Sequence, residues 1–444
     1  MAATPQKLQS PKGTRDFYPI EMATRRHIEA AWRSASVDCG FEEIDGPTFE
    51  HLELYTIKSG EGIVNELFSF TRAGGEATYA LRPEFTPTLA RMVVAKGQQL
   101  PLPLKWFCMP SMFRAERPQR GRLREFQQWN ADIVGTGGCE ADAEIISVAV
   151  LALERLGLTP ADVQVRISHR DAMGNVLRRI GVRDEGVAAA FELIDRRDRL
   201  PPEEFMKRAE VLGFTPQGTA HFERVARTRL PLSTSVEELA DAVQVPIDDL
   251  APLAALRDRL ATLSLSAWCS WDLGIVRGLA YYTGAVFEIH EITGAERAIA
   301  GGGRYDTLVE LFGGPSMPAC GFGMGDVVLS LVLADRGLLK PEERLPRPDV
   351  FLLSNGSEVA ERALPGLLSE LRRSGLHARQ SYKTTRNIGK LLGDAGKVRA
   401  RFAAILDEKL IENTVTLKNL DTGEQTEVRL EDLGALCRAG GSRT

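Results

Sequence analysis

The stretch Phe113–Gln128, FRAERPQRGRLREFQQ, sets five arginines around one proline and one glycine. It joins two runs, residues 102–113 and 124–134, whose composition predicts the strands of a long hairpin. An arginine keeps its charge at physiological pH, and its planar guanidinium matches the geometry of a phosphate group. The hairpin is therefore predicted to hold a polyanion in a defined orientation. The alternative is an ordinary charged loop exposed to water.

The composition sets broad limits on the rest of the chain. Its 444 residues suggest two to three domains, and 43% hydrophobic with 26% charged residues is typical of a soluble globular protein. A net charge of −5 excludes a global attraction to nucleic acid, so any such surface must be a local patch. The sequence begins without the apolar core of a signal peptide and has no run of about 20 apolar residues. We therefore expect a cytoplasmic protein that spans no membrane.

The cysteines and histidines argue against a metal or disulfide framework. The six cysteines are scattered without a CxxC pair, and the six histidines do not cluster. This usage fits reduced thiols and predicts no metal ligands among the side chains.

The local patterns divide the chain into three parts. Helical spacing in residues 20–38 and 86–95 accompanies strand-like runs at 78–82, 267–273 and 285–289. Residues 172–263 are rich in Arg, Glu, Leu and Ala at helical spacing and read as a helical insertion. Residues 338–348 read as a linker. Beyond them, strand-like runs at 349–353, 376–381 and 402–406 alternate with helical segments, which predicts a small α/β domain with a partly parallel sheet.

The return strand of the hairpin has an unusual face. Because alternate residues of a strand share a side, Arg124, Phe126, Gln128, Asn130 and Asp132 point one way. A core-facing strand avoids so polar a face unless it lines a site. The alternative is a strand that faces solvent.

Two further segments carry polar groups. Glu84 and Thr86 lie at a strand-to-helix junction and could bind an ammonium group; otherwise they are a first-turn acid and a cap. Arg277 could neutralise charge that develops in a reaction, and Tyr281 and Tyr282 could wall a flat polar ring. The tyrosines could equally be ordinary core residues.

Two runs are rich in glycine, residues 301–303 and 321–325. Neither is a Walker loop, since no GKS or GKT follows, and the second lacks the spacing of a dinucleotide fingerprint. Their glycines more plausibly let the backbone approach a flat base or sugar closely.

Together these motifs resemble the histidine–tRNA ligase family of class II aminoacyl-tRNA synthetases. The resemblance covers residues 13 to about 430, and a C-terminal run at 418–426 looks like the family's last hairpin. The motifs that carry it are Leu81–Glu84, Phe113–Pro118, Arg277–Tyr282 and Gly302–Asp306.

The resemblance implies a fold and an assembly. An α+β catalytic domain, with a six-stranded antiparallel sheet, would comprise residues 1–171 and 264–340. The helical insertion would comprise 172–263, and a C-terminal α/β anticodon-binding domain 348–444. The protein would be a homodimer, with the segment around Gly46 and Pro47 at the interface.

The resemblance also implies an ATP site. The hairpin would bind bent ATP, with Arg114 on the α-phosphate, Glu116 near the adenine and Arg122 near the outer phosphates. Arg277 would lie beside the reacting carboxylate and the α-phosphate. Arg114 and Arg277 would thus be the catalytic residues, and Mg²⁺ would neutralise the nucleotide phosphates.

The remaining residues would bind histidine. Glu84, Thr86 and Gln128 would hold the α-ammonium group. Asp132 and Tyr282 would hydrogen-bond the imidazole, with Tyr281 beside them. The implied activity is ligation of L-histidine to tRNA(His) through a histidyl-adenylate.

The sequence departs from the family pattern at three places. Val328 stands where an arginine usually contacts the γ-phosphate, so ATP binding would rely on Arg122 or Arg120, or be weak. Ala280 replaces a common aspartate, and Asp132 stands where many bacterial members have glutamate. The change at Val328 keeps a second hypothesis open: a non-catalytic, histidine-sensing paralogue resembling the regulatory subunit of ATP phosphoribosyltransferase. That subunit typically lacks the tRNA-reading C-terminal domain, which this chain keeps.

A local basic stripe runs through residues 372–401 of the C-terminal part. It holds nine lysines and arginines and a single acid, Asp394. Such a stripe could follow a phosphate backbone. The alternative is a solvated helix face.

Overall fold

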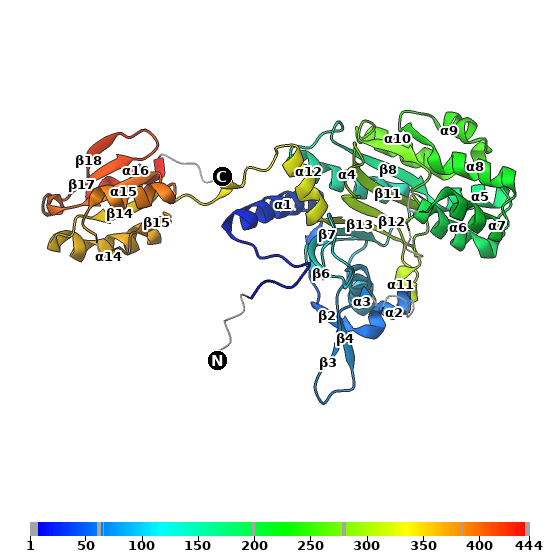
Figure 1. Cartoon of the computed structure of the whole chain (residues 1–444), viewed down its shortest axis with the longest axis horizontal. Helices are drawn as coiled ribbons and strands as arrows, with labels where there is room; N and C mark the ends of the chain where they lie inside the picture. Colours follow the sequence, from blue (N-terminus) through cyan, green and yellow to red (C-terminus); the bar gives the residue numbers. More distant parts are fainter. Residues whose placement is uncertain are drawn as a thin grey trace, which may run out of the picture. The chain divides into compact units, whose positions relative to one another are not determined.

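The computed structural model describes residues 8–59, 64, 66–197, 200–277, 281–383 and 385–439. The chain forms two compact units, residues 1–343 and 344–444 (Figure 1). Residues 278–280 of the Arg277–Tyr282 motif, including the Ala280 departure, lie outside the described residues.

A large sheet organises the first unit. Within the described residues it has ten strands in the order β1-β5-β7-β13-β12-β11-β8-β10-β9, with β6 pairing with β7. The strands are β1 (Glu42–Glu43), β5 (Leu104–Cys108), β6 (Ser111–Phe113), β7 (Glu125–Val134), β8 (Val163–His169), β9 (Arg229–Pro231), β10 (Cys269–Asp272), β11 (Ala285–Glu291), β12 (Ala300–Arg304) and β13 (Ala319–Gly325).

The predicted α+β class and the antiparallel centre are confirmed, but the sheet is mixed. The six strands from β5 to β8 pair antiparallel throughout. Outside them, β1 is parallel to β5 and β10 is parallel to β8. Parallel neighbours need a long crossover connection. The helical segment between β8 and β10 provides one, and residues 44–103 provide the other, so an antiparallel sheet alone was the wrong expectation.

Alternation along β7 separates the two faces of this sheet. Trp129, Ala131 and Ile133 enter the main core, against helices α1 (Pro19–Asp38), α4 (Cys139–Arg155) and α12 (Asp326–Asp335). Trp32 of α1 stacks on Trp129 with ring centroids 5.9 Å apart. Gln128, Asn130 and Asp132 lie on the other face, where α3 (Thr86–Lys96) and α11 (Leu308–Leu311) supply a second, smaller core. The site is built on this second face.

A small three-stranded sheet leads into the site. It has the order β2-β4-β3, and its strands are β2 (Phe49–His51), β3 (Ser69–Thr71) and β4 (Thr78–Leu81), with α2 (Leu52–Ser59) between β2 and β3 in the chain. Just after β4, the buried Arg82 donates to the carbonyl oxygens of Ser111 (2.9 Å) and Gly46 (2.8 Å). These bonds fix the strand-to-helix junction beside the hairpin.

The segment between β8 and β10 is mainly helical. Its helices are α5 (Arg170–Arg179), α6 (Asp184–Arg196), α7 (Pro202–Val211), α8 (Pro216–Arg227), α9 (Val236–Val243) and α10 (Ile247–Thr262). It also holds β9, which the helical reading missed. A three-residue edge strand that ends in proline is too short to leave a periodic signal. That residues 172–263 form a separate domain remains a prediction.

The second unit is an α/β sandwich with a partly parallel sheet, as predicted. The order is β15-β14-β16-β17-β18, with β14 parallel to both β15 and β16. Apolar clusters lie on both faces of this sheet. The elements are β14 (Val350–Ser354), α14 (Glu358–Arg373), β15 (Ala378–Gln380), α15 (Ile388–Lys397), β16 (Phe402–Leu406), β17 (Thr414–Asn419), β18 (Gln425–Arg429) and α16 (Leu433–Ala439), with the short α13 (Pro341–Arg344) in the segment read as a linker.

Candidate active site

One cavity on the second face of the sheet gathers most of the predicted site residues. It is lined by Glu84, Thr86, Arg114, Gln128, Asn130, Asp132, Arg277, Tyr281, Tyr282, Gly301, Tyr305, Gly321, Phe322 and Gly323. All eight residues expected to bind histidine or to act in catalysis are therefore brought together, from segments far apart in the sequence. Asn130, Tyr305 and Phe322 were not assigned to the site from the sequence.

The β7 wall of this cavity is buried, so the solvent-facing alternative for this strand is wrong. Asn130 and Asp132 are 6% and 7% exposed, and β7 is flanked by β5 and β13. A polar strand face survives burial only where its groups find partners or line a site. Here they line the cavity.

The glycine-rich runs are strands β12 and β13, and their glycines make room for the polar side chains. A Cβ atom on Gly323 would lie 2.5 Å from Gln128 Nε2, and one on Gly321 would lie 2.8 Å from Asp132 Cγ. On the neighbouring strand, a Cβ on Gly301 would lie 2.5 Å from Arg277 Cζ. At such distances the polar side chains could not keep their present positions, so the glycines let them lie flat over the sheet.

Asp132 receives a hydrogen bond from the hydroxyl group of Tyr305. Burial raises the pKa of Asp132 to about 7, although the bond from Tyr305 works in the opposite direction. Burial also raises the pKa of Tyr305 well above its usual value, so the phenol keeps its proton and remains a donor. This carboxylate–phenol pair is the centre of the polar end of the cavity.

The signal that could have identified Tyr305 as a site residue is its position directly after Arg304. Arg304 is held by Asp142 (Nε to Oδ2, 3.1 Å) and by the carbonyl oxygens of Thr136 and Gly138. Arg304 is thus a buried structural residue on the opposite side of β12. Alternation then directs Tyr305, the next residue, toward the cavity.

The strand-to-helix junction supplies Glu84 and Thr86, both half-buried. Helix α3 has Phe85 as its N-cap and makes no side-chain cap bond, and Thr86 is the first helical residue. The alternative that Thr86 is a cap is therefore wrong. Both side chains line the cavity near the helix N-terminus.

Arg277 is positioned by its backbone and by an acidic partner. Its φ of 54° is left-handed, which is rare for a residue with a Cβ and marks functional sites. Its guanidinium donates to Glu288 Oε1 (2.7 Å), and Glu288 Oε2 lies 2.8 Å from His290 Nε2. Burial works to raise the pKa of Glu288, but His290 and Arg277 outweigh it and lower that pKa to about 2. The cation therefore stays fixed and charged beside Tyr282, whose ring centroid is 5.9 Å away.

Tyr281 and Tyr282 belong both to the second core and to the cavity wall. Their ring centroids are 4.8 Å apart, and Tyr305 meets Tyr281 edge-on at 5.9 Å. Burial raises the pKa of both tyrosines, so all three phenols can donate hydrogen bonds at neutral pH. The two interpretations of these tyrosines, as core residues and as site residues, are thus compatible.

A larger cavity of about 500 Å³ adjoins the first and shares Arg114, Gln128, Arg277, Gly301 and Gly323 with it. Its wall carries four arginines, Arg114, Arg122, Arg277 and Arg297, and the apolar Val327 and Val328. Its other ionisable lining groups are Glu288 and His290, which bond to each other. This cavity can hold a polyanion.

The charged side chains of the hairpin differ in their partners and in whether they line a cavity. Arg114 donates to the carbonyl oxygen of Pro83 (3.1 Å), and its guanidinium lies 5.1 Å from the centroid of the Phe126 ring. Glu116 forms an ion pair with Arg122 and is not among the lining residues of either cavity. The tip is closed by paired backbone bonds between Gln119 and Arg122. The predicted contact of Glu116 with an adenine remains untested.

Within the described ranges, no three His, Cys, Asp or Glu side chains come together as a metal site. None of the helices in those ranges is both long and apolar enough to cross a membrane.

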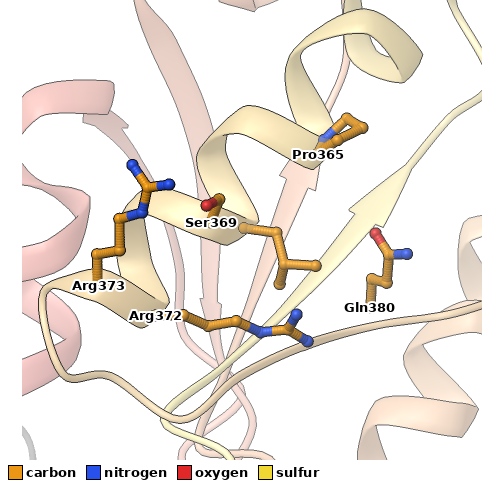
Figure 2. Close-up of a pocket in the computed structure, with 6 residues that line it drawn as sticks. Pro365, Ser369, Arg372, Arg373 and Gln380 are labelled. Carbon is orange, nitrogen blue, oxygen red and sulfur yellow. The ribbon is translucent and has the colours of Figure 1, made fainter.

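Among the described residues of the second unit, surface cavities lie along the basic stripe. One, of about 380 Å³, lies between α14 and β15 and is lined by Pro365, Leu368, Ser369, Arg372, Arg373 and Gln380 (Figure 2). Another includes Tyr382, Lys383 and Arg386. Tyr382 is 86% exposed. An exposed aromatic ring between cations is the kind of group on which nucleotide bases stack.

Comparison with known proteins identifies the class. Residues 13–325 match the family model described as histidyl-tRNA synthetase, and residues 349–439 match the model of an anticodon binding domain. The histidine–tRNA ligase of Opitutus terrae is 39% identical, over 97% of this chain and 98% of that protein. The ligase of Halobacterium salinarum is 39% identical, over 94% of each. The antiparallel centre, the arginine hairpin and these matches define a class II aminoacyl-tRNA synthetase.

The chain belongs to the histidyl-tRNA synthetase family. The crystal structure of histidyl-tRNA synthetase from Nostoc sp. PCC 7120 has the same fold, with a TM-score of 0.77, 24% identity, and coverage of 98% of this chain and 99% of that one.

Proposed function

We propose that the protein ligates L-histidine to tRNA(His), first forming histidyl-adenylate from histidine and ATP. The observation that carries the proposal is the pair of adjoining cavities. The smaller one is lined by a buried acid and phenols, the larger one by arginines, and the two share Arg114 and Arg277. Reacting atoms must approach to about 3–3.5 Å. The shared cations therefore lie where a carboxylate in one cavity would meet a phosphate in the other.

The smaller cavity suits an imidazole side chain. Neutral imidazole presents one donor and one acceptor. Asp132 would accept from the donor nitrogen, and Tyr282 would donate to the other, with Tyr305 holding the Asp132 carboxylate. A site that pairs both nitrogens rejects an apolar isostere by ~10⁴-fold or more, since the unmatched buried groups are costly. Glu84, Thr86 and Gln128 would bind the α-ammonium group at the helix α3 end.

The larger cavity suits the triphosphate. The histidine carboxylate attacks the α-phosphorus, a bond forms between carboxylate oxygen and phosphorus, and pyrophosphate leaves. Two anions must approach, so Arg114 on the α-phosphate and Arg277 beside both reactants would lower their repulsion and stabilise the charge of the transition state. Glu288 and His290 would keep the Arg277 guanidinium in place. Arg122 would reach the outer phosphates.

Mg²⁺ would enter with the nucleotide and neutralise part of its charge. Since the described residues form no cluster of three metal-binding side chains, its ligands would be chiefly phosphate oxygens and water, as is usual for this ion.

Assembly and location are also part of the proposal. We infer a cytoplasmic homodimer in which the small sheet after Gly46 and Pro47 lies at the interface. Phe49 and Phe70 of this sheet are 48% and 42% exposed, and their rings pack edge-on at 5.6 Å. An exposed aromatic cluster favours burial against a second copy.

The C-terminal unit would bind the anticodon arm. Arg373, Lys383 and Arg386 would contact the phosphate backbone, and Tyr382 would stack on a base. The non-catalytic alternative is less well supported, because the curated relatives are ligases over nearly their full length and the chain keeps the anticodon-binding unit.

The test is an ATP–pyrophosphate exchange assay run with each of the twenty amino acids. We expect exchange with histidine alone. Absence of histidine-dependent exchange by the pure, folded protein would overturn the proposal. Copurification with a phosphoribosyltransferase, together with failure to bind tRNA, would favour the regulatory alternative instead.

A further inference from the structure

The larger cavity poses a problem for binding the outer phosphates. Val328 of α12 lines its wall with an apolar side chain. Arg120 and Arg122, the two arginines suggested by the sequence as substitutes, are both bound to acids. Arg120 donates from Nε to Glu296 Oε1 (2.7 Å) and lies outside the lining of this cavity, while Arg122 is ion-paired with Glu116.

Arg297 lies next to Val328 on the same wall. Both line the larger cavity, and both flank Gly121 at the hairpin tip. A Cβ atom on Gly121 would lie 3.2 Å from Val328 Cγ2 and 3.8 Å from Arg297 Cδ. The Val328 methyl group and the aliphatic stem of the half-buried Arg297 therefore meet at Gly121, and both side chains line the same cavity.

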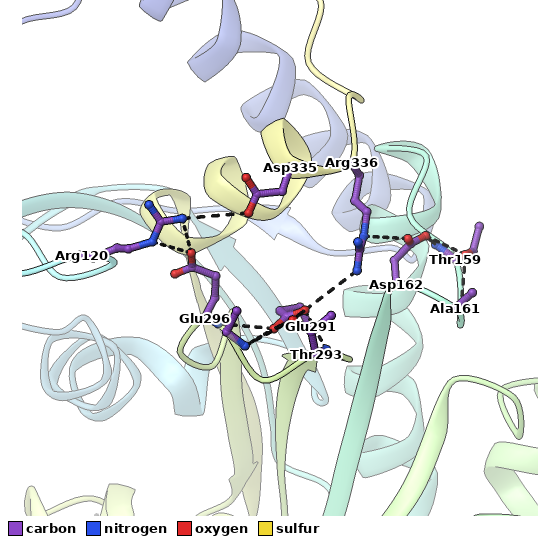
Figure 3. Close-up of polar contacts among 10 residues, drawn as sticks. Arg120, Thr159, Ala161, Asp162, Glu291, Thr293, Glu296, Asp335 and Arg336 are labelled. Atoms are coloured by element: carbon purple, nitrogen blue, oxygen red, sulfur yellow. Dashed lines mark hydrogen bonds and ion pairs between the residues drawn. The ribbon is translucent and has the colours of Figure 1, made fainter.

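The loop that carries Arg297, between β11 and β12, is held rigidly (Figure 3). The buried Glu291 accepts from Thr293 N (2.9 Å), Thr293 Oγ1 (2.8 Å) and Ala295 N (2.5 Å), so its carboxylate closes the loop on itself. Arg336, the residue that follows α12, bridges Glu291 (3.9 Å) and Asp162 (2.9 Å). A side chain on this loop starts from a fixed backbone.

A second tie joins the loop to the hairpin. Glu296, the residue before Arg297, is 9% exposed, and its carboxylate accepts a hydrogen bond from Arg120 at the hairpin tip. Arg120 thereby acts as a brace between hairpin, loop and Asp335 of α12, which lies 4.0 Å from it (Figure 3). The brace orients Arg297 toward the wall that Gly121 and Val328 share.

We propose that Arg297 binds the outer phosphates of ATP beside Arg122, whose charge is partly neutralised by its ion pair with Glu116, and takes the place of the arginine that Val328 replaces. The proposal rests on the proposed function for the identity of the ligand. An arginine fixed at its backbone loses little freedom on binding, and its planar fork can contact two phosphate oxygens at once. Arg120 and Glu296 are positioning residues in this scheme.

The proposal is tested by measuring the Kd of the full-length protein for ATP and for AMP by calorimetry. We expect Arg297→Gln to raise the Kd for ATP by about 10- to 100-fold, equivalent to about 1.4–2.8 kcal/mol, and to change the Kd for AMP less than about threefold. Arg297→Lys should retain most of the ATP affinity. Adding Val328→Arg to Arg297→Gln should recover it, because residue 328 lines the same cavity and lies beside Gly121 as Arg297 does. Arg257→Gln, a change of a half-buried arginine on α10 outside both cavities, is the matched control.

An unchanged Kd for ATP in Arg297→Gln, or equal losses for ATP and AMP, would overturn the inference. The histidine-dependent exchange of the wild-type protein is scored separately. A protein that exchanges but binds ATP without Arg297 contradicts only this inference. A protein that needs Arg297 for ATP but does not exchange contradicts only the proposed function.

Discussion

Replacing Asp132 with asparagine should make the protein more stable and less able to bind histidine. Asp132 is 7% exposed, and burial raises its pKa to about 7, against about 3.9 in an unfolded chain. A folded pKa above the unfolded pKa means that ionisation opposes folding. The penalty is absent below about pH 4, grows as the pH rises toward 7 and is constant above that.

The size of the effect follows from the two pKa values. At 1.36 kcal/mol per pKa unit, the ionised carboxylate lowers the free energy of unfolding by about 4 kcal/mol at pH 8 and by about 1–2 kcal/mol at pH 5. Asparagine is neutral at both pH values, and its Oδ1 can still accept from Tyr305. We therefore expect Asp132→Asn to gain up to these amounts, with the larger gain at pH 8.

Urea unfolding followed by tryptophan fluorescence measures this gain. All five tryptophans lie in the first unit, so the signal reports that unit alone. In parallel, the Kd for histidine should rise by about 10- to 100-fold, the range expected when a hydrogen bond to a charged group is lost.

A second buried acid provides the control. Burial raises the pKa of Asp142 to about 6, but this carboxylate is paired with Arg304 (3.0 Å). Asp142→Asn should gain less stability at pH 8 than Asp132→Asn, because its folded pKa is lower and because the change weakens one partner of the buried Arg304 cation, which keeps Asp306 (3.0 Å). If Asp132→Asn destabilises at pH 8, or if its histidine affinity is unchanged, then Asp132 is a structural carboxylate and the assignment of the histidine pocket is wrong.

Three further predictions concern the reaction, the assembly and the tRNA. Arg277→Ala should lower the rate of adenylation by about 10²- to 10³-fold with a much smaller loss of histidine affinity, since its charge acts mostly in the transition state; equal losses in exchange kinetics and equilibrium binding would make it a ground-state group. Phe49→Glu should shift the protein toward monomers in analytical ultracentrifugation at micromolar concentration; an unchanged dimer would place the interface elsewhere. Tyr382→Ala should raise the KM for tRNA by about tenfold, the worth of one stacked base, while leaving pyrophosphate exchange at the wild-type rate; a parallel loss of exchange would argue against a role in tRNA binding.

The alternation along β7 shows what a local pattern can predict. Gln128, Asn130 and Asp132 repeat with a period of two in a run that is otherwise apolar on its other side, and strand geometry then requires them to share a face. The structure has them on one buried wall. The motif and the period were visible in the sequence because both are local.

The glycine strands show where local reasoning fails. Glycine is unfavourable in strand interiors, so residues 301–303 and 321–325 were not predicted to be strands, and their glycines were interpreted only as allowing close approach of a base or sugar. They are central strands, paired with each other over five positions. Their glycines are needed by Arg277, Asp132 and Gln128, which come from other segments and lie across them. A contact between residues about 190 apart in the chain leaves no periodic signal near either one.

The basic stripe of the C-terminal unit shows the same limit of local reasoning for charged residues. The sequence predicts a row of cations here, but in the structure several of these side chains are bound to other groups of the protein. Arg372 donates to Ala378 O (3.0 Å), Lys383 pairs with Asp394 (2.7 Å) and Arg401 lies 3.4 Å from Asp349. Exposed ion pairs exchange easily with phosphates, because each is worth only about 0–1 kcal/mol. The long-range electrostatic attraction of tRNA to this face can therefore depend on the number of cations, as the sequence predicts. The contacts that orient the anticodon arm depend instead on which ion pairs open and on the exposed ring of Tyr382.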